Sequence, residues 1–422
     1  MTDTKKKSDG AYENAFLGIG TAKDRSAQTK AIAPVILDPG TLTSLYAGDG
    51  LAAKIVDLPA DEMVRAGFEI EGLDDKREAM AELEGLKVLP SIALAVKWAR
   101  LFGGGLIVML INDGSDFAEP LNENRIKAVE QLRVYDRWDV TRHTRYDDPM
   151  DIRYGKTKQW MVSPVNGQPY IVHESRCVMI DGDAVPDRMR DVNDGWGGST
   201  VNRIYRDLIR NGMSLEWGNA LLERAQQGIH AIPGLSDILS QPGGEAMVIR
   251  RINLVDMARS VNNTVVIDGE EKYTLESTSL SGVADIMDRM GLALAAVAEI
   301  PESLLFGRQL GGLSSTGKSD LEHWYARIGQ EQQTLILPPL DRIVGLVMKA
   351  MGVYADEYLI KFLPLWMPSA KETAETAKTE ADTRKIYADM GALDPSEVRK
   401  ALIDEGYDID DIKLEYGEKE PV

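Results

Sequence analysis

Apolar side chains recur every three or four residues over several long segments of the chain. That spacing places them on one face of an α-helix. We therefore expect helices over residues 50–66, 90–102, 200–227 and 282–299, and a last helix that runs from residue 319 to about 335 and resumes after Pro338-Pro339 to residue 351. Because proline cannot donate the helical hydrogen bond, Pro59 should kink or divide the first helix, and Pro338-Pro339 should kink the last.

A second pattern, short apolar runs between turn signals, fills residues 133–180. It is typical of β-strands, and Asn166-Gly167 is one of the turn signals. A further strand, 106–111, follows the second helix across Gly103-Gly104-Gly105. These glycines precede a strand and do not open a helix. We therefore interpret them as a close helix–strand contact and not as a phosphate-binding loop.

The segments between these elements are polar or rich in turn residues. They are a disordered arm (1–30), a glycine-rich loop (191–199), a mixed segment ending near residue 273, a loop rich in Gly and Ser (301–317) and a solvated helix (369–388). Ser199 or Thr200 can cap the helix that follows the second of them. Within that helix, Gly212 and Gly218 either weaken it or allow close packing. The expected fold class is α+β, mainly helical.

Composition restricts the chemistry of the chain. A length of 422 residues suits about two to four subdomains. The single cysteine, Cys177, excludes an internal disulfide and a thiolate zinc site, and the four histidines lack metal-ligand spacing. We expect no catalytic residue, metal or cofactor. Without a secretory signal or a membrane-spanning apolar run, we expect a soluble protein made in a reducing cytosol.

The formal net charge of −19 argues against a conventional DNA-binding protein, which is basic. A protein that lets DNA pass without gripping it needs the opposite design, because an acidic wall repels the duplex. Acidic charge can also serve solubility alone. Charge does not separate these two interpretations.

One motif suggests an enzyme. Residues Gly312 to Ser319 match the P-loop pattern G-x-x-x-x-G-K-[ST], in which Lys318 would contact phosphates. A P-loop requires a preceding strand, and Pro301 and the glycines that follow it predict none. We favour an exposed loop between two helices. Asp181-Gly182-Asp183 is likewise interpreted as a turn and not as a metal-binding carboxylate pair.

Seven segments of the chain carry a further pattern: Ala99–Gly105, His173–Arg176, Gly195–Ser199, Ile300–Gly307, Gly312–Tyr325, Gln330–Pro339 and Asp394–Arg399. Together with the order of elements, they resemble tailed-bacteriophage portal proteins, in particular a branch often described only as an uncharacterised phage-associated family. The resemblance covers about residues 40–410. Lys318 departs from it, since the family pattern has an acidic residue there, and this departure creates the P-loop match.

The resemblance implies a portal fold with wing, stem, clip and helical crown. On this chain the parts would be the wing (31–198 with 319–365), two stem helices (199–228 and 279–300), the clip (229–278), a channel loop (301–318) and the crown (366–422). Within the channel loop, the residues expected near DNA phosphates are Arg308, Gln309, Ser314, Ser315 and Lys318.

The resemblance also implies a function and partners. About twelve copies would form a closed ring at the unique vertex of a capsid, made in the host cytoplasm. Double-stranded DNA would pass through the ring during packaging and ejection. Terminase, the major capsid or scaffold protein and tail adaptors would dock on it. One alternative is a P-loop ATPase or kinase. A second is another head–tail connector component, although such proteins are usually shorter. A third, a portal core fused to an added activity, is disfavoured because no residues remain for an extra domain.

Overall fold

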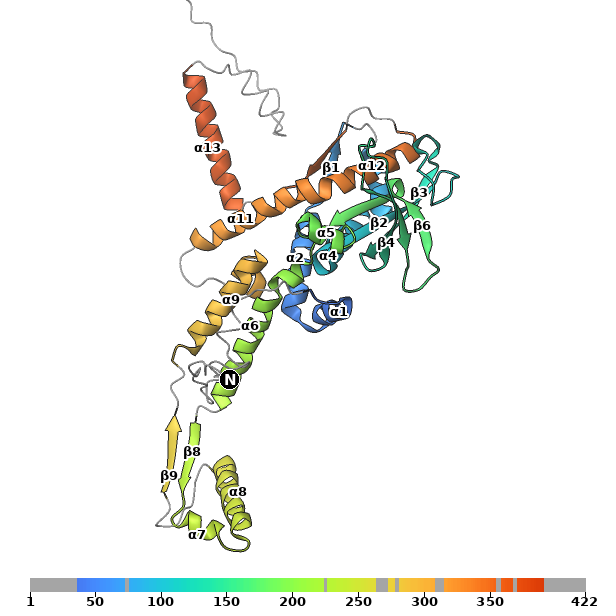
Figure 1. The fold of residues 1–422 in the computed structure, drawn as a ribbon. Helices are drawn as coiled ribbons and strands as arrows, with labels where there is room; N and C mark the ends of the chain where they lie inside the picture. The colour runs from blue at the N-terminus through green and yellow to red at the C-terminus, as the bar shows by residue number, and fades with distance from the viewer. Residues whose placement is uncertain are drawn as a thin grey trace, which may run out of the picture. The chain divides into compact units, whose positions relative to one another are not determined.

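The computed structural model describes residues 36–72, 76–223, 226–262, 272–277, 281–307, 315–353, 358–366 and 370–390. The chain divides into two units, residues 1–363 and 364–422. Helices predominate, and the described strands form small antiparallel sheets, which confirms the expected fold class (Figure 1). The arm expected over residues 1–30 and the helix expected near Asp394 lie outside the described residues.

The helices that precede the main sheet are α1 (Pro39–Gly48), α2 (Gly50–Arg65), α3 (Lys76–Gly85) and α4 (Val88–Phe102). Helix α2 is continuous through Pro59, so the division that was one of two expected outcomes does not occur. Proline cannot donate a hydrogen bond to the carbonyl of Ile55 one turn earlier. Arg100 on α4 supplies a donor instead, because its Nη2 lies 3.0 Å from Ile55 O.

The β-rich region predicted over 133–180 is confirmed as two three-stranded sheets. Strand β2 (Gly104–Asn112) is the centre of the first, between β3 (Ala128–Asp136) and β7 (Cys177–Asp181). The second has the order β4 (Val140–Arg145), β5 (Thr157–Val162), β6 (Tyr170–His173). Short helices complete the region: η1 (Glu123–Arg125), η2 (Glu174–Arg176) and α5 (Asp187–Val192).

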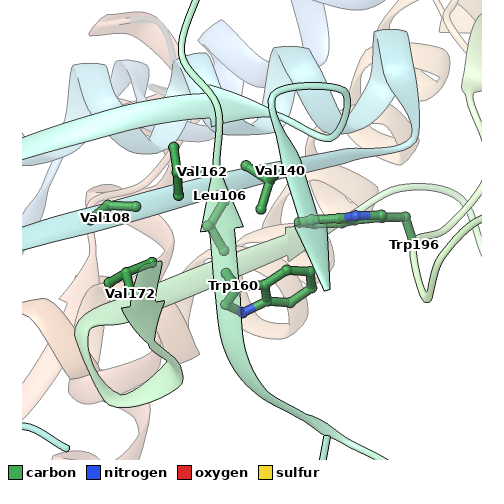
Figure 2. Close-up of a cluster of buried hydrophobic side chains, with 7 residues drawn as sticks. All are labelled: Leu106, Val108, Val140, Trp160, Val162, Val172 and Trp196. Carbon is green, nitrogen blue, oxygen red and sulfur yellow. The ribbon is translucent and has the colours of Figure 1, made fainter. Parts of the chain in front are cut away.

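The two sheets share one hydrophobic core. Its buried members come from β2, β4, β5, β6 and the loop before α6, as Figure 2 shows: Leu106, Val108, Val140, Trp160, Val162, Val172 and Trp196. The rings of Trp160 and Trp196 lie 5.1 Å apart between centroids at an interplanar angle of 35°. The core therefore fixes the loop before α6 against both sheets.

The glycines at the start of β2 are confirmed as a close helix–strand contact. A Cβ on Gly105 would lie 2.3 Å from the carbonyl oxygen of Ala95 on α4. A Cβ on Gly104 would lie 2.1 Å from the ring of Trp196. Both distances are far shorter than a van der Waals contact. Only glycine lets the helix, the strand and the tryptophan approach this closely.

Two helices lie side by side after the sheets: α6 (Thr200–Glu223) and α9 (Val283–Ala298) (Figure 1). The expected capping role belongs to Ser199, whose Oγ accepts a hydrogen bond from Asn202 N at 3.2 Å. Gly218 allows close packing, because its Cβ would lie 2.9 Å from Met287 Sδ on α9, whereas Gly212 has nothing within 4 Å.

The mixed segment between these two helices contains a hairpin-like pair of strands and two helices. Strand β8 (Gln226–Ala231) pairs antiparallel with β9 (Lys272–Ser277), so that Gly228 lies opposite Leu275. Between the two strands lie α7 (Leu235–Leu239) and α8 (Gly244–Asn262).

A long helical run follows α9. Its continuous part consists of α11 (Ser315–Glu331), the π-helical segment η3 (Gln332–Ile336) and α12 (Leu337–Ala350), and the short helix α10 (Glu302–Phe306) precedes the undescribed residues 308–314. The irregular turn lies just before Pro338-Pro339, which occupy the first turn of α12, where missing N–H groups cost little. The sequence pattern predicted that the helix stops near residue 335 and resumes after the prolines. This prediction is wrong, because the backbone is helical throughout. A π-turn, in which Leu337 N donates to Gln332 O, accommodates the prolines.

Strand β1 (Phe68–Glu71) pairs antiparallel with β10 (Leu359–Phe362), which ends the first unit. In the second unit, α13 (Ala370–Asp389) is confirmed as a solvated helix, since nearly all of its described side chains are exposed. Among the described residues, no helix combines the length and the apolar character needed to cross a bilayer.

Candidate DNA-channel segment

The structure describes only part of the segment expected to form a channel loop. Arg308, Gln309 and Ser314 lie outside the described residues. Ser315 and Lys318 lie in the first turn of α11, so the backbone there is helical and not a loop. At its other end the segment begins with α10. Helices thus occupy both ends of a segment that was expected to be a loop over residues 301–318.

The backbone does not have the strand–loop–helix arrangement of a P-loop. In the described part of the chain, α9 and α10 precede the motif, and the strand before them, β9, is separated from it by both helices. Gly317, Lys318 and Ser319 follow the first residues of α11. Among the described residues, no strand therefore leads into the motif in the way that a P-loop requires.

The Asp181-Gly182-Asp183 segment is engaged in hydrogen bonds within the protein. Asp181 Oδ1 accepts from Gly197 N at 2.7 Å, and its Oδ2 lies 2.6 Å from Arg190 Nη1. Asp183 accepts from Thr200 Oγ1 at 3.1 Å and pairs with an arginine of α6. The two carboxylates thus bind different partners, which supports the interpretation as a structural turn.

The N-terminal end of the candidate segment is fixed on α9. Glu299 ends this helix in the left-handed conformation with φ 58°, and Ile300 after it is 2% exposed. Leu305 of α10 is buried, and Phe306 packs on Gly291, whose Cβ would lie 3.4 Å from the ring. The reversal of the chain after α9 is therefore built into the core.

The C-terminal end is tied to the same point by Arg327 of α11. Its Nη1 lies 2.5 Å from Glu299 Oε2 and donates to Glu299 O at 2.9 Å, and its Nε donates to Glu331 at 2.9 Å. Sequence reasoning missed this clamp. An arginine on a polar helix face carries no local signal that it will bind a residue 28 positions away.

Helix α11 also rests on α2. Trp324 and Ile328 are buried on its inner face, and the buried Gln332 donates from Nε2 to Met63 O at 2.7 Å. Arg65 of α2 lies over the ring of Tyr325 at 5.8 Å from its centroid. The backbone on both sides of residues 308–314 is thus held by α2, α9 and α11.

A second feature of this region is a pair of unlike grooves on the two sides of the α6–α9 contact. The first is an apolar cavity of about 330 Å³. Met213, Trp217 and Leu221 line it from one stripe of α6, and Ile286 and Met290 line it from α9. Arg210 is its charged lining residue.

The other groove, of about 280 Å³, is lined by a different stripe of α6 that includes Asn211 and Leu215. Its charged lining residues are Asp288 of α9 and Glu302 of α10. One side of the helix pair is therefore apolar with a cation, and the other side carries carboxylates.

Comparison with known proteins gives the family. The sequence profile described as "Phage portal protein" matches residues 41–386. Two curated relatives, from Caulobacter sp. (strain RHG1) and Sphingomonas paeninsulae, are both named "Anti-CBASS protein Acb1". Each is 29% identical to this chain, and the matches cover 88% and 90% of it. They cover 61% and 62% of those proteins, so this chain spans about three-fifths of their length.

Solved structures show a weaker likeness. The neck of a native gene transfer agent particle, computed with C12 symmetry, contains a chain that is 15% identical over 89% of this chain and 96% of its own length, with a TM-score of 0.49. The family profile itself covers most of the sequence and nearly all of the described helices and strands. The chain therefore belongs to the phage portal protein family.

Proposed function

We propose that this chain is the subunit of a closed ring of about twelve copies at the unique vertex of a phage capsid. The ring is the channel for double-stranded DNA during packaging and ejection, and terminase, capsid or scaffold and tail adaptor proteins dock on it. Membership of a structural, non-enzymatic family supports this proposal. Its parts would be those expected from the sequence: wing, stem helices, clip, channel loop and crown.

The observation that carries the ring is the pair of unlike grooves beside α6 and α9. A ring needs a heterologous contact, in which one face of a subunit binds a different face of its neighbour. The groove lined by Met213, Trp217 and Leu221 is apolar, whereas the other groove carries Asp288 and Glu302, so the two faces are unlike. Trp217 at 50% exposure and Ile286 at 57% exposure would be covered by such a contact.

Helix α8 supports the same conclusion. Met247, Ile249, Ile252, Leu254 and Met257 are each at least 44% exposed. At 3.6 residues per turn they spread over more than half of the helix circumference. Exposed apolar side chains on several sides of one helix indicate contacts with other surfaces. Contacts with neighbouring copies on both sides would bury it.

The charge of the chain suits a passive channel. About twelve copies at −19 each carry roughly −230 charges, which repel a duplex that passes through the bore. Lys318 would add one positive charge per copy close to the N-terminus of α11, where backbone N–H groups also favour anions. Such sparse contacts hold DNA transiently without gripping it.

The channel segment is tested by Lys318→Glu in a packaging assay. The expected result is altered packaging or genome retention with unchanged ring assembly. Loss of the rings themselves would place Lys318 in a subunit interface. Tight binding of magnesium-ATP that Lys318→Ala abolishes would instead support a nucleotide-binding enzyme.

The ring itself is tested by negative-stain electron microscopy of the purified chain, with the mass measured by light scattering. We expect particles of about twelve subunits with a central hole. An exclusively monomeric or dimeric protein, in the presence of its scaffold protein as well as alone, would contradict the proposal.

A further inference from the structure

The charges of helix α13 repeat every seven residues along its sequence. The repeat consists of three lysines and three acids: Lys371, Lys378, Lys385, Glu375, Asp382 and Asp389. Seven residues are two turns of a helix that wraps around a neighbouring helix. Such a period keeps each row of side chains against the same partner along the whole contact. The repeat therefore indicates that α13 packs lengthwise against another helix.

Two uncharged rows also run along α13, each with alternating spacings of three and four residues. The alanine face consists of Ala374, Ala377 and Ala381. The second row, which we call the threonine–methionine face, consists of Thr376, Thr379, Thr383, Ile386 and Met390. At 3.6 residues per turn, the centres of the two faces lie roughly 170° apart around the helix. One side of α13 is thus shallow, and the other carries larger side chains.

The described part of the chain covers neither face. Ile386 and Met390 are 56% and 76% exposed. Ala374 and Ala381 are exposed as well. A second surface is therefore needed to bury the larger apolar side chains of α13.

The threonines make the threonine–methionine face less polar than its composition indicates. Thr379 Oγ1 donates to Glu375 O at 2.8 Å, and Thr383 Oγ1 donates to Thr379 O at 2.8 Å. These hydroxyl groups are thus satisfied by the backbone of the preceding turn. Their methyl groups remain available for packing beside Ile386.

The charged rows lie between the two faces, on one side of the helix. The order around the helix is the alanine face, the lysines, the acids and then the threonine–methionine face. Two parallel copies that pack alanine face to threonine–methionine face bring the lysines of one copy beside the acids of the other. In an antiparallel pair, the lysines and the acids would lie on opposite sides of the contact. The charges therefore select a parallel helix with the same sequence, which is a second copy of this chain.

Three of these charges have no partner among the described residues of their own chain: Lys378, Asp382 and Lys385 form no ion pair there. In two parallel copies at the same height, Asp382 of one copy lies between Lys378 and Lys385 of the other. The offsets along the axis are about 6 and 4.5 Å, which a lysine side chain can span. The contact would thus give each of these charges an opposite charge.

A symmetric pairing of two alanine faces is disfavoured. Arg384 follows Ala381 at a spacing of three residues and continues the alanine row. A parallel pair of alanine faces would bring the two Arg384 side chains together, and it would leave Ile386 and Met390 uncovered.

We propose that α13 packs in parallel between the α13 helices of the two neighbouring copies, with its alanine face against the threonine–methionine face of one of them. This inference rests on the proposed ring. Rotation about the ring axis gives every copy one neighbour for each of its two faces, which is the heterologous contact that a closed ring requires.

The test is disulfide cross-linking of the full chain that carries Ala381→Cys and Thr379→Cys together. The two positions lie on opposite sides of one helix, so they cannot join within a copy. After mild oxidation we expect a series of covalent multimers on a non-reducing gel, because each copy offers one thiol to each neighbour. The two single variants are the matched controls. Each should remain monomeric on the gel, as should the original chain, which retains Cys177.

The charges are tested in the chain that carries both cysteines. Lys378→Glu with Lys385→Glu should slow the cross-linking about fivefold or more, because two ion pairs per contact become repulsive. Adding Asp382→Lys should restore the rate, since opposite charges again face each other. Lys127→Glu with Lys156→Glu changes two exposed lysines of the first unit and should leave the rate unchanged. An unchanged rate in the α13 lysine variant would overturn the proposal.

Light scattering separates this contact from the ring itself. Rings whose cysteine pair gives no cross-link would overturn the α13 contact and leave the ring standing. Cross-linked dimers of Ala381→Cys alone would overturn it in favour of paired alanine faces. Absence of rings from the original chain would contradict the proposed function and this contact with it.

Discussion

The two-sheet region and the α6–α9 pair differ in how far their large side chains are buried. Around the sheets, Trp196 and Arg176 are each 1% exposed, and the arginine is paired with a buried Asp113. On α6, Trp217 and Leu222 are 50% and 61% exposed. The sheet region therefore buries its core and the Arg176–Asp113 ion pair within one chain. The helix pair leaves apolar surface exposed, and the proposed ring would cover it.

The largest effect that separates the two regions is expected from Asp113→Asn. The carboxylate accepts hydrogen bonds from Arg176 at 2.8 and 3.0 Å and from the backbone N–H groups of Ser115 and Asn122. Its loss leaves a buried guanidinium without its counter-charge, which costs about 3–5 kcal/mol of the free energy of unfolding. Urea denaturation measures this. As the control, Asp147→Asn at an exposed site should change the free energy of unfolding by less than about 0.5 kcal/mol. A loss below about 1 kcal/mol in Asp113→Asn would show that the Arg176–Asp113 pair does not stabilise the sheets.

The same carboxylate predicts a pH dependence. Burial alone would raise the pKa of Asp113, but the N–H groups of Asn122 and Ser115 and the guanidinium of Arg176 outweigh it and lower the pKa from 3.8 to about 2. A lowered pKa stabilises the folded state above the unfolded value, and this contribution is lost as the pH falls from about 4 to 2. The difference in unfolding free energy between the original chain and Asp113→Asn should therefore shrink by about 2.5 kcal/mol over that range. A difference that stays constant between pH 5 and pH 2 would contradict this account.

Glycine substitutions should act in opposite directions in the two regions. Gly105→Ala forces a methyl group against the backbone of α4 and should destabilise the chain by about 1–3 kcal/mol. Gly212→Ala, in the interior of α6 with nothing within 4 Å, should stabilise it by about 0.5–1 kcal/mol. Thermal unfolding followed by circular dichroism compares them. Equal effects at both positions would remove the distinction in packing.

A comparably small effect is expected at the junction of the two regions. Ser199→Ala removes the N-cap of α6 and the hydrogen bond from Ser199 Oγ to Leu101 O at 2.6 Å. A loss of about 1 kcal/mol is expected in chemical denaturation. Ser163→Ala, at an exposed serine, is the control and should be neutral. If the two variants were equally stable, the cap would not matter to α6.

Local signals in the sequence predicted much of the fold. Apolar periodicity gave helices close to α4, α6 and α9, and Gly103 to Gly105 indicated the close helix–strand contact. Local rules failed where distant residues compensate. The helix that contains Pro59 is continuous, and Arg100 donates to the carbonyl oxygen of Ile55, which the proline leaves without its helical donor. A π-turn accommodates Pro338-Pro339. Neither compensation is visible from the proline alone.

The candidate site was harder to predict for the same reason. The P-loop match at Lys318 is a local pattern. Whether such a pattern forms a P-loop depends on the element before it, and the described elements before it are the helices α9 and α10. The clamp of Arg327 on Glu299 and the apolar groove between α6 and α9 each join residues that are far apart in the chain. Sequence spacing carries no information about such contacts, so only the fold brings these residues together.

The most direct test of the central claim, that the grooves beside α6 and α9 close a ring, is the particle mass of Trp217→Ser, measured by light scattering and compared with that of Tyr154→Ser. Tyr154 is an exposed aromatic residue outside the grooves, at 59% exposure. We predict that Tyr154→Ser forms rings of about twelve subunits and that Trp217→Ser remains monomeric while its urea denaturation is unchanged. Rings of Trp217→Ser that form as readily as those of the control would contradict the claim.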